Sequence, residues 1–143
     1  MSKNMILAEA IIISRYSDII LGILQRHKEL SINKVLVFSF LIKKNMFNVK
    51  EVYSVKNSRD IMLKCISKLS GGFQDYCNEI EYILKAIHLL IKNGDLIFQN
   101  QQIMYVSKSN KSTFIVEKFI DKCINESKKM TDRQFLKEVM NNV

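Results

Sequence analysis

Proline is absent from this chain of 143 residues, and glycine occurs only four times. Both residues interrupt helices and mark turns, so a chain with so few of them is expected to consist almost entirely of regular secondary structure. Few loops then remain to hold catalytic residues. Tryptophan is absent too, but 48% of the residues are apolar, which is enough for a hydrophobic core and excludes a disordered chain. No repeat or linker divides the sequence, so we expect one domain over residues 1–143.

Long apolar runs and paired cysteines are also lacking. No stretch reaches the ~20 uninterrupted apolar residues of a membrane span, because charged residues interrupt even the richest segment, 6–24. That segment also lacks the cleavage site of a signal peptide. Cys65, Cys77 and Cys123 are an odd number at wide spacing, which favours reduced thiols in the core. We therefore expect a cytoplasmic protein without a membrane partner.

The residues that carry catalytic and metal chemistry are sparse and badly spaced. Cys77 and His88 would lie about 16 Å apart along a helix, too far to share a metal ion, and the only other histidine is His27. Glu79 and Glu81 would diverge by roughly 200° on a helix, so they do not form a pair for acid–base catalysis. No CxxC, HExxH or HxH motif occurs. The sequence predicts no catalytic, cofactor-binding or metal-binding residue, and no enzyme.

The apolar pattern predicts a mainly α fold with a small β-hairpin: a winged-helix-like core over about 31–107, an N-terminal helix over about 5–28, and two C-terminal helices over about 112–141. Ser31 suits a helix N-cap, and the run that follows it, 35–42, fits a helix or a buried strand. Thr131 and Gln134 form a capping box for the last helix. Within the core we expect helices over about 32–45, 58–69 and 74–93, a strand over 49–55 and a hairpin over 95–107, and then a helix that starts at Ser112 or Thr113.

The formal charge of +8 invites a nucleic-acid interpretation, but the basic residues are unevenly placed. Twelve Lys and Arg face five Asp and Glu over residues 1–70, and the two kinds nearly balance over 71–143. The candidate contacts to a nucleic-acid backbone are Lys43, Lys44, Arg59, Lys64 and Lys68. The alternative is a solvated surface enriched in lysine by codon bias, because isoleucine and asparagine are abundant while alanine occurs only three times.

The predicted recognition helix argues against direct reading of DNA. In a winged helix the second helix of the motif enters the major groove by its N-terminal residues. Here the first positions expected to be exposed include Asp75, Glu79 and Glu81, and no Lys or Arg precedes Lys85. Carboxylates at these positions would oppose the contacts to phosphate that supply most non-specific affinity.

Two helices carry more apolar residues than one buried face requires. Helix 74–93 has an unbroken apolar stripe, which includes Leu84 and is expected to face the core, and a second apolar line that lies off this stripe. The N-terminal helix has consecutive isoleucines at 11–13. Either a partner protein covers these faces, or the two C-terminal helices do. The candidate partner-facing residues are Ile11, Ile12, Tyr82, Ala86 and Leu89.

Several of these features occur together in a known family. They are the apolar N-terminal helix, the polar link 25–30, the run 35–42 ending in Lys43-Lys44, the helix over 83–90 with Asn93-Gly94, and the hairpin over 96–106. In this order, over about 5–107, the chain resembles the middle component subunits of bacterial ABC-three-component conflict systems, including Lamassu-type antiphage systems. The resemblance implies a non-enzymatic adaptor between an SMC/Rad50-like ATPase and an effector, often a nuclease, which it restrains until foreign DNA is detected. The alternative is a winged-helix DNA-binding transcriptional regulator.

Overall fold

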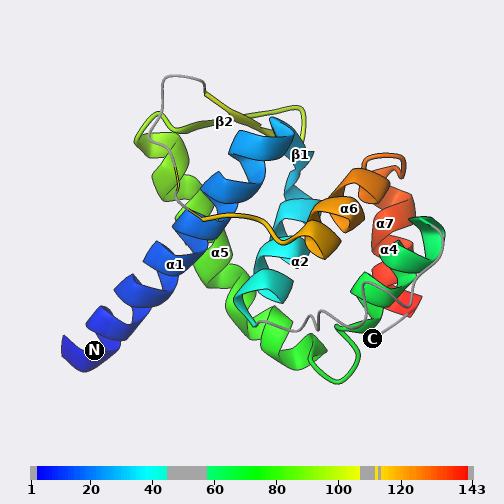
Figure 1. Cartoon of the computed structure of the whole chain (residues 1–143). Coiled ribbons are helices and arrows are strands. Elements are labelled where there is room, and N and C mark those ends of the chain that lie inside the picture. Colours follow the sequence, from blue (N-terminus) through cyan, green and yellow to red (C-terminus); the bar gives the residue numbers. More distant parts are fainter. Residues whose placement is uncertain (1–2, 45–57, 107–111, 113, 142–143) are drawn as a thin grey trace.

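The structure, a computed structural model, describes residues 3–44, 58–106, 112 and 114–141 (Figure 1). This part of the chain is mainly helical and includes a small three-stranded antiparallel sheet, as the sequence predicts in outline. The strand expected over 49–55 lies outside the described residues. In chain order the elements are α1 (Lys3–His27), β1 (Glu29–Ser31), α2 (Ile32–Lys43), α4 (Ser58–Ser67), α5 (Phe73–Lys92), β2 (Leu96–Gln99), β3 (Gln102–Tyr105), α6 (Lys118–Ser127) and α7 (Asp132–Asn141).

Helix α2 is the central element of the core. Every residue from Lys34 to Leu41 is buried, and α2 packs against α1, α5, α6 and α7. A helix covered on all sides is apolar all round, which is why periodicity alone did not separate it from a strand. Ser31 caps it as predicted, with its Oγ accepting a hydrogen bond of 3.4 Å from the backbone N–H of Lys34.

Helix α1 is buried only in its C-terminal half. The residues from Ile19 to Leu24 are buried, as is Tyr16, and α1 packs more extensively on α5 than on any other element. Its N-terminal turns project beyond α5 (Figure 1). Burial therefore divides this helix into an anchored half and an exposed half.

The sheet has the order β1-β3-β2, and its first strand was not predicted from the sequence. Leu30 pairs with Ile103 of the predicted hairpin, and both side chains are buried. Lys28, with a φ of 73°, separates α1 from β1. A strand of three residues with one apolar side chain directed inward is too short to show alternation, so the sequence indicated only a polar link there.

The helix expected to begin at Ser112 or Thr113 begins at Lys118. Ser112 instead binds α1: its N–H and C=O pair with the amide of Gln25, and its Oγ donates to the carbonyl of Asp18. The same Oγ accepts a hydrogen bond from Phe114 N, a local turn that competes with helix initiation. The last helix follows the prediction, because Thr131 and Gln134 form both hydrogen bonds of the capping box.

The three cysteines do not share one environment. Cys65 and Cys123 are buried, as expected, and burial raises the pKa of the Cys65 thiol, with Cys123 adding to the effect. Cys77 is exposed, so its prediction as a core thiol was wrong. Its side chain faces solvent, although Tyr76 and Glu79, which flank it in the sequence of α5, are buried.

Candidate functional site

The exposed N-terminal turns of α1 carry apolar side chains on several sides. Ile11 is 67% exposed, and three further large apolar residues precede it in the first two turns. Exposed apolar residues that cluster in this way mark sites of interaction more often than single ones do. The three preceding residues are Met5, Ile6 and Leu7.

An apolar groove of about 850 Å³ lies between α1 and α5. Its apolar lining is Ile13 of α1 with Ile80, Leu84 and Leu89 of α5. We call these four groove residues, together with the exposed Met5, Ile6, Leu7 and Ile11 on the adjoining end of α1, the α1–α5 surface; the latter four do not line the groove itself. The lining of the groove is more apolar than that of the three other cavities compared with it.

The structure separates the five predicted partner-facing residues. Ile11 and Leu89, the latter 43% exposed, belong to the α1–α5 surface. Ile12 and Tyr82 are half-buried and pack against the core. Ala86 is fully buried, so its prediction as a partner-facing residue was wrong: at this position of α5 the side chain faces the core.

Sequence reasoning missed the contribution of Leu84. Its position in the apolar stripe of α5 indicated an inward side chain, but the structure leaves it exposed in the groove beside Ile80. The stripe is wider than the face that the core covers. The excess width of the stripe was therefore the signal in the sequence that some of its residues are exposed. Which residues these are depends on where α1 lies on α5.

Charged side chains border the groove. The ammonium of Lys85 binds the carboxylate of Glu9, and this ion pair links α1 to α5. The same ammonium lies 3.1 Å from Oε1 of Glu81, one turn earlier on α5 itself. These two carboxylates raise the pKa of Lys85. His88 and Lys92 complete the rim and are exposed. One end of the groove is thus basic.

The candidate nucleic-acid contacts do not form one described surface. Lys43 lies 2.8 Å from Oε1 of Glu79 and over the ring of Tyr16, so its charge is already paired. Lys44 is exposed and lies over the ring of Phe40. The side chain of Arg59 lies outside the described residues, and Lys64 and Lys68 are half-buried.

Glu79 corrects the expected charge at the start of α5. We expected an exposed carboxylate, but Glu79 is buried against Lys43. Burial, with the charge of Glu79 as the second cause, raises the pKa of the Tyr16 hydroxyl well above its usual range. Asp75 and Glu81 remain exposed, so the beginning of α5 still offers no basic side chain to a phosphate.

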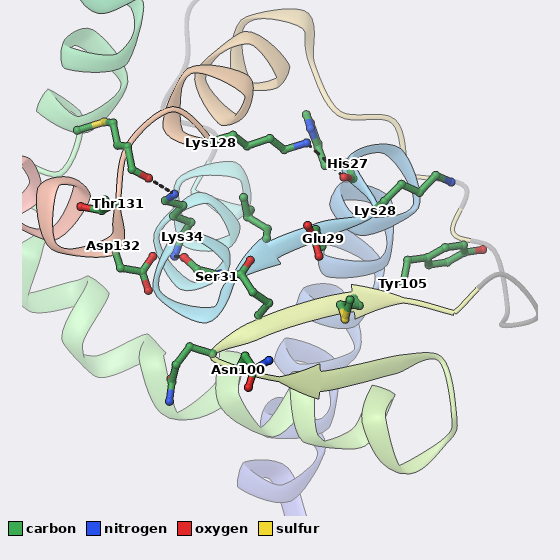
Figure 2. Close-up of a pocket in the computed structure, with 15 residues that line it drawn as sticks. His27, Lys28, Glu29, Ser31, Lys34, Asn100, Tyr105, Lys128, Thr131 and Asp132 are labelled. Carbon is green, nitrogen blue, oxygen red and sulfur yellow. Dashed lines mark hydrogen bonds between the residues drawn. The ribbon is translucent and has the colours of Figure 1, made fainter.

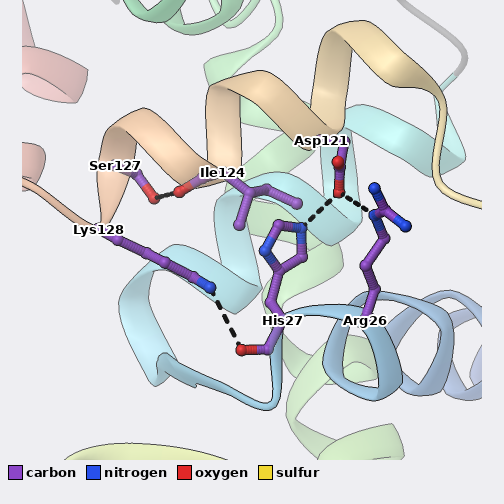
Figure 3. A network of polar contacts seen from close by, with 6 residues as sticks. All are labelled: Arg26, His27, Asp121, Ile124, Ser127 and Lys128. Carbon is purple, nitrogen blue, oxygen red and sulfur yellow. Dashed lines mark hydrogen bonds and ion pairs between the residues drawn. The ribbon is translucent and has the colours of Figure 1, made fainter.

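A polar network joins the end of α1 to α6 (Figure 3). Nε of Arg26 donates a hydrogen bond of 2.8 Å to Oδ1 of Asp121. Nε2 of the buried His27 lies 2.7 Å from the same oxygen, an ion-pair distance, although no hydrogen bond is aligned between them. Lys128 donates from its ammonium to the carbonyl of His27, over 3.2 Å.

This network shifts two pKa values. Burial is the largest cause that lowers the pKa of His27, Lys128 lowers it further, and Asp121 acts in the opposite direction. Partial burial raises the pKa of Asp121, but the hydrogen bond from Arg26 and the contact with His27 outweigh it, so the net pKa lies below the ordinary value. His27 is thus held neutral near neutral pH, in contact with an ionised carboxylate.

Among the described residues, no group of three His, Cys, Asp or Glu side chains is placed to hold a metal ion. Within the same ranges, no helix is long and apolar enough to cross a membrane. Comparison with known proteins gives no relative: no family model, curated protein or solved structure matches this chain.

Proposed function

We propose that this protein is a non-enzymatic adaptor subunit of a bacterial antiviral defence complex in the cytoplasm. It joins an SMC/Rad50-like ATPase to an effector such as a nuclease, and restrains the effector until foreign DNA is detected. The observation that carries the adaptor role is the α1–α5 surface, an apolar groove beside a projecting apolar helix end. The identity of the partners comes from the resemblance to middle component subunits.

The occupant that best fits the groove is an amphipathic helix of the ATPase. The lining of the groove on α5 runs from Cys77 to Lys92, about 22 Å at the rise of an α-helix, which accommodates about four turns of a partner helix. Lys85 is already paired, whereas Lys92 and His88 lie free of ion pairs among the described contacts. We therefore expect the docking helix to place an acidic residue at this end of the groove.

A winged-helix arrangement is part of this proposal. Helices α2, α4 and α5 precede the hairpin β2–β3, and β1 adds a third strand to the hairpin, and this order supports the proposal of a helical core with a wing. In an adaptor this core would position the α1–α5 surface.

The second candidate function is a winged-helix transcriptional regulator. The net charge and the hairpin favour it. It predicts binding to DNA that weakens steeply with salt, and weaker binding by a Lys64→Ala/Lys68→Ala variant. The pairing of Lys43 with Glu79, and the exposed Asp75 and Glu81, support the adaptor over the regulator.

Co-purification with the products of neighbouring genes tests the adaptor role. We expect the chain to purify in a complex with an ATPase that has a long coiled-coil arm. A Leu89→Asp substitution places a charge in the apolar groove, which is expected to weaken the complex by at least about 30-fold. Leu136→Asp on α7 is the matched control, because Leu136 is 38% exposed and lies outside the groove.

Two results would contradict the proposal. A dispersed monomer that co-purifies with none of the neighbouring gene products removes the adaptor role. A Leu89→Asp variant that keeps its fold and binds the partner as tightly as Leu136→Asp removes the groove as the docking site.

A further inference from the structure

A second cavity, of about 800 Å³, lies where the end of α1, strand β1, the tip of the hairpin and the α6–α7 junction meet (Figure 2). It shares no lining residue with the α1–α5 groove. Its lining is mostly polar and includes Ser31, Lys34, Asn100, Lys128 and Asp132. The proposed adaptor function makes no use of it.

Residues with a positive backbone φ lie together at this cavity. Among the described residues, three that are not glycine have a positive φ: Lys28 at 73°, Asn100 at 53° and Gln101 at 65°. All three line this cavity. Asn100 and Gln101 adopt this region of φ as the two residues of the turn between β2 and β3, whereas in a lysine such as Lys28 it costs free energy.

Main-chain hydrogen bonds fix the wall that these residues form. The carbonyl of Lys28 accepts a hydrogen bond of 2.8 Å from the N–H of Tyr105, and the carbonyl of Gln101 accepts one of 3.1 Å from the N–H of Ile32. Lys28 and Gln101 are therefore held against β3 and the start of α2, and they form a preorganised wall.

Two ammonium groups are held at the cavity by backbone carbonyls. Lys34 is only 6% exposed, and its Nζ donates to the carbonyl of Met130 over 2.7 Å (Figure 2). Nζ of Lys128 donates to the carbonyl of His27 over 3.2 Å. An ammonium has three N–H donors, and each of these two makes one hydrogen bond among the described contacts. Donors therefore remain for a ligand.

The positive charge at the cavity is only partly compensated. Burial lowers the pKa of Lys34 although the carboxylate of Asp132 acts in the opposite direction, and Lys128 lowers the pKa of His27. Oδ2 of Asp132 is also engaged by Nδ2 of Asn33, at 3.2 Å. Glu29, the other carboxylate of the lining, is exposed. Lys34 and Lys128 donate to different carbonyls on the cavity lining, so an anion bound beside either ammonium would complete its hydrogen bonds and balance its charge.

We propose that this cavity binds a phosphate group, carried by a nucleotide or by the end of a nucleic acid. Ionised phosphate oxygens accept hydrogen bonds, which matches the ammonium groups of Lys34 and Lys128, and Asn100 and Gln101 on the same lining carry further N–H donors. The volume is that of a small-molecule site. An apolar ligand would leave these donors unpaired.

Thermal unfolding and calorimetric titration at constant ionic strength test the site. The probes are inorganic phosphate, ATP, and a short single-stranded DNA with and without a 5′-phosphate. We expect ATP or the 5′-phosphorylated DNA to bind at millimolar concentration or below and to raise Tm. A response to ATP alone identifies a free nucleotide as the source of the phosphate, and a response that needs the 5′-phosphate identifies a nucleic-acid end.

Lys128→Ala is the deciding variant, because Lys128 is exposed and its loss is expected to leave the fold intact. Loss of one charge-assisted hydrogen bond is expected to weaken binding by about tenfold or more. Lys128→Arg, which keeps the charge, is expected to retain binding, and Lys137→Ala on α7 removes a charge outside the cavity and should change nothing. No response to any probe, or a response that Lys128→Ala leaves unchanged, overturns the proposal. Neither outcome affects the adaptor function, which is tested at Leu89.

Discussion

His27 is a buried titratable side chain at the junction of α1 and α6, and it should make stability depend on pH. Burial lowers its folded-state pKa below the ordinary value of 6.5. Well above pH 6.5 the imidazole is neutral in both the folded and the unfolded chain, so its contribution to stability is fully present. As the pH falls below this value the unfolded chain takes up the proton first. We therefore expect Tm to decrease from pH 7.5 to pH 5.5, measured by circular dichroism.

His27→Gln is the control for this prediction. Glutamine keeps a polar side chain next to Asp121 but does not titrate, so the decrease between the two pH values should become smaller. Asp121 does not explain the effect, because its pKa is lowered from 3.8 and it remains ionised throughout this interval. An unchanged pH dependence in His27→Gln would assign the effect to another group.

Gln101 occupies a backbone conformation that favours glycine. Its φ is 65°, and it follows Asn100 at 53° in the two-residue turn between β2 and β3. Gln101→Gly gives the Asn-Gly pair preferred in such turns and removes the strain. We expect the free energy of unfolding in urea to rise by about 0.5–1 kcal/mol. Gln99→Gly in β2, where φ is not positive, should lower it by a similar amount.

Among the elements, the sequence predicts those that are defined by a long apolar face or by a cap. The boundaries of α5 and α7 follow the predictions closely, because the stripe of α5 and the capping box of Thr131 are local signals. The late start of α6 could not be predicted, since Ser112 binds Gln25, which is 87 residues away in the chain. Strand β1 exists because β3 pairs with it, and that partner is also far away in the chain.

The same distinction applies to the candidate site. An excess of apolar residues on α1 and α5 was visible in the sequence, and Ile11 and Leu89 were identified correctly as exposed. Which of the remaining side chains faces solvent depends on where α1 lies on α5. For this reason the sequence placed Ala86 at the surface and Leu84 in the core, whereas the structure shows the reverse.

Gly22 determines how closely the segment before α6 can cross α1. A Cβ atom added at this position would lie 2.8 Å from Cδ1 of Phe114 and 3.0 Å from its backbone oxygen. Alanine at an unhindered helix position stabilises relative to glycine, by roughly 1 kcal/mol. Here we expect Gly22→Ala to lower the free energy of unfolding by about 1–3 kcal/mol, because the backbone of Phe114 must move.

Urea denaturation measures this effect, and Ser14→Ala is the matched control. Ser14 is exposed on the same helix, and the substitution there should change stability by less than about 0.5 kcal/mol. A stabilising Gly22→Ala variant would show that the crossing segment does not rest on α1 at this point.

For the whole molecule, stability is concentrated around α2, and part of the candidate docking surface lies on the N-terminal turns of α1, which have little packing support. The N-terminal turns of α1 expose Met5, Ile6, Leu7 and Ile11, whereas the turns from Ile19 to Leu24 are buried. A single helix end without packing is marginally stable in water. The two candidate sites also share no lining residue, so a partner on α1–α5 and a phosphate in the second cavity could bind at the same time.

Hydrogen exchange, read by mass spectrometry, connects this gradient of stability to function. In the isolated chain we expect the amides of residues 3–13 to exchange at least about 100-fold faster than those of residues 19–24. When the partner helix occupies the groove, protection should rise over residues 3–13 and along α5 around Leu84 and Leu89, and the Leu89→Asp variant should not show this rise. Strong protection of residues 3–13 in the isolated chain would mean that a second copy already covers the surface. A concentration-dependent mass in solution would then accompany it, and the surface would not be free for another subunit.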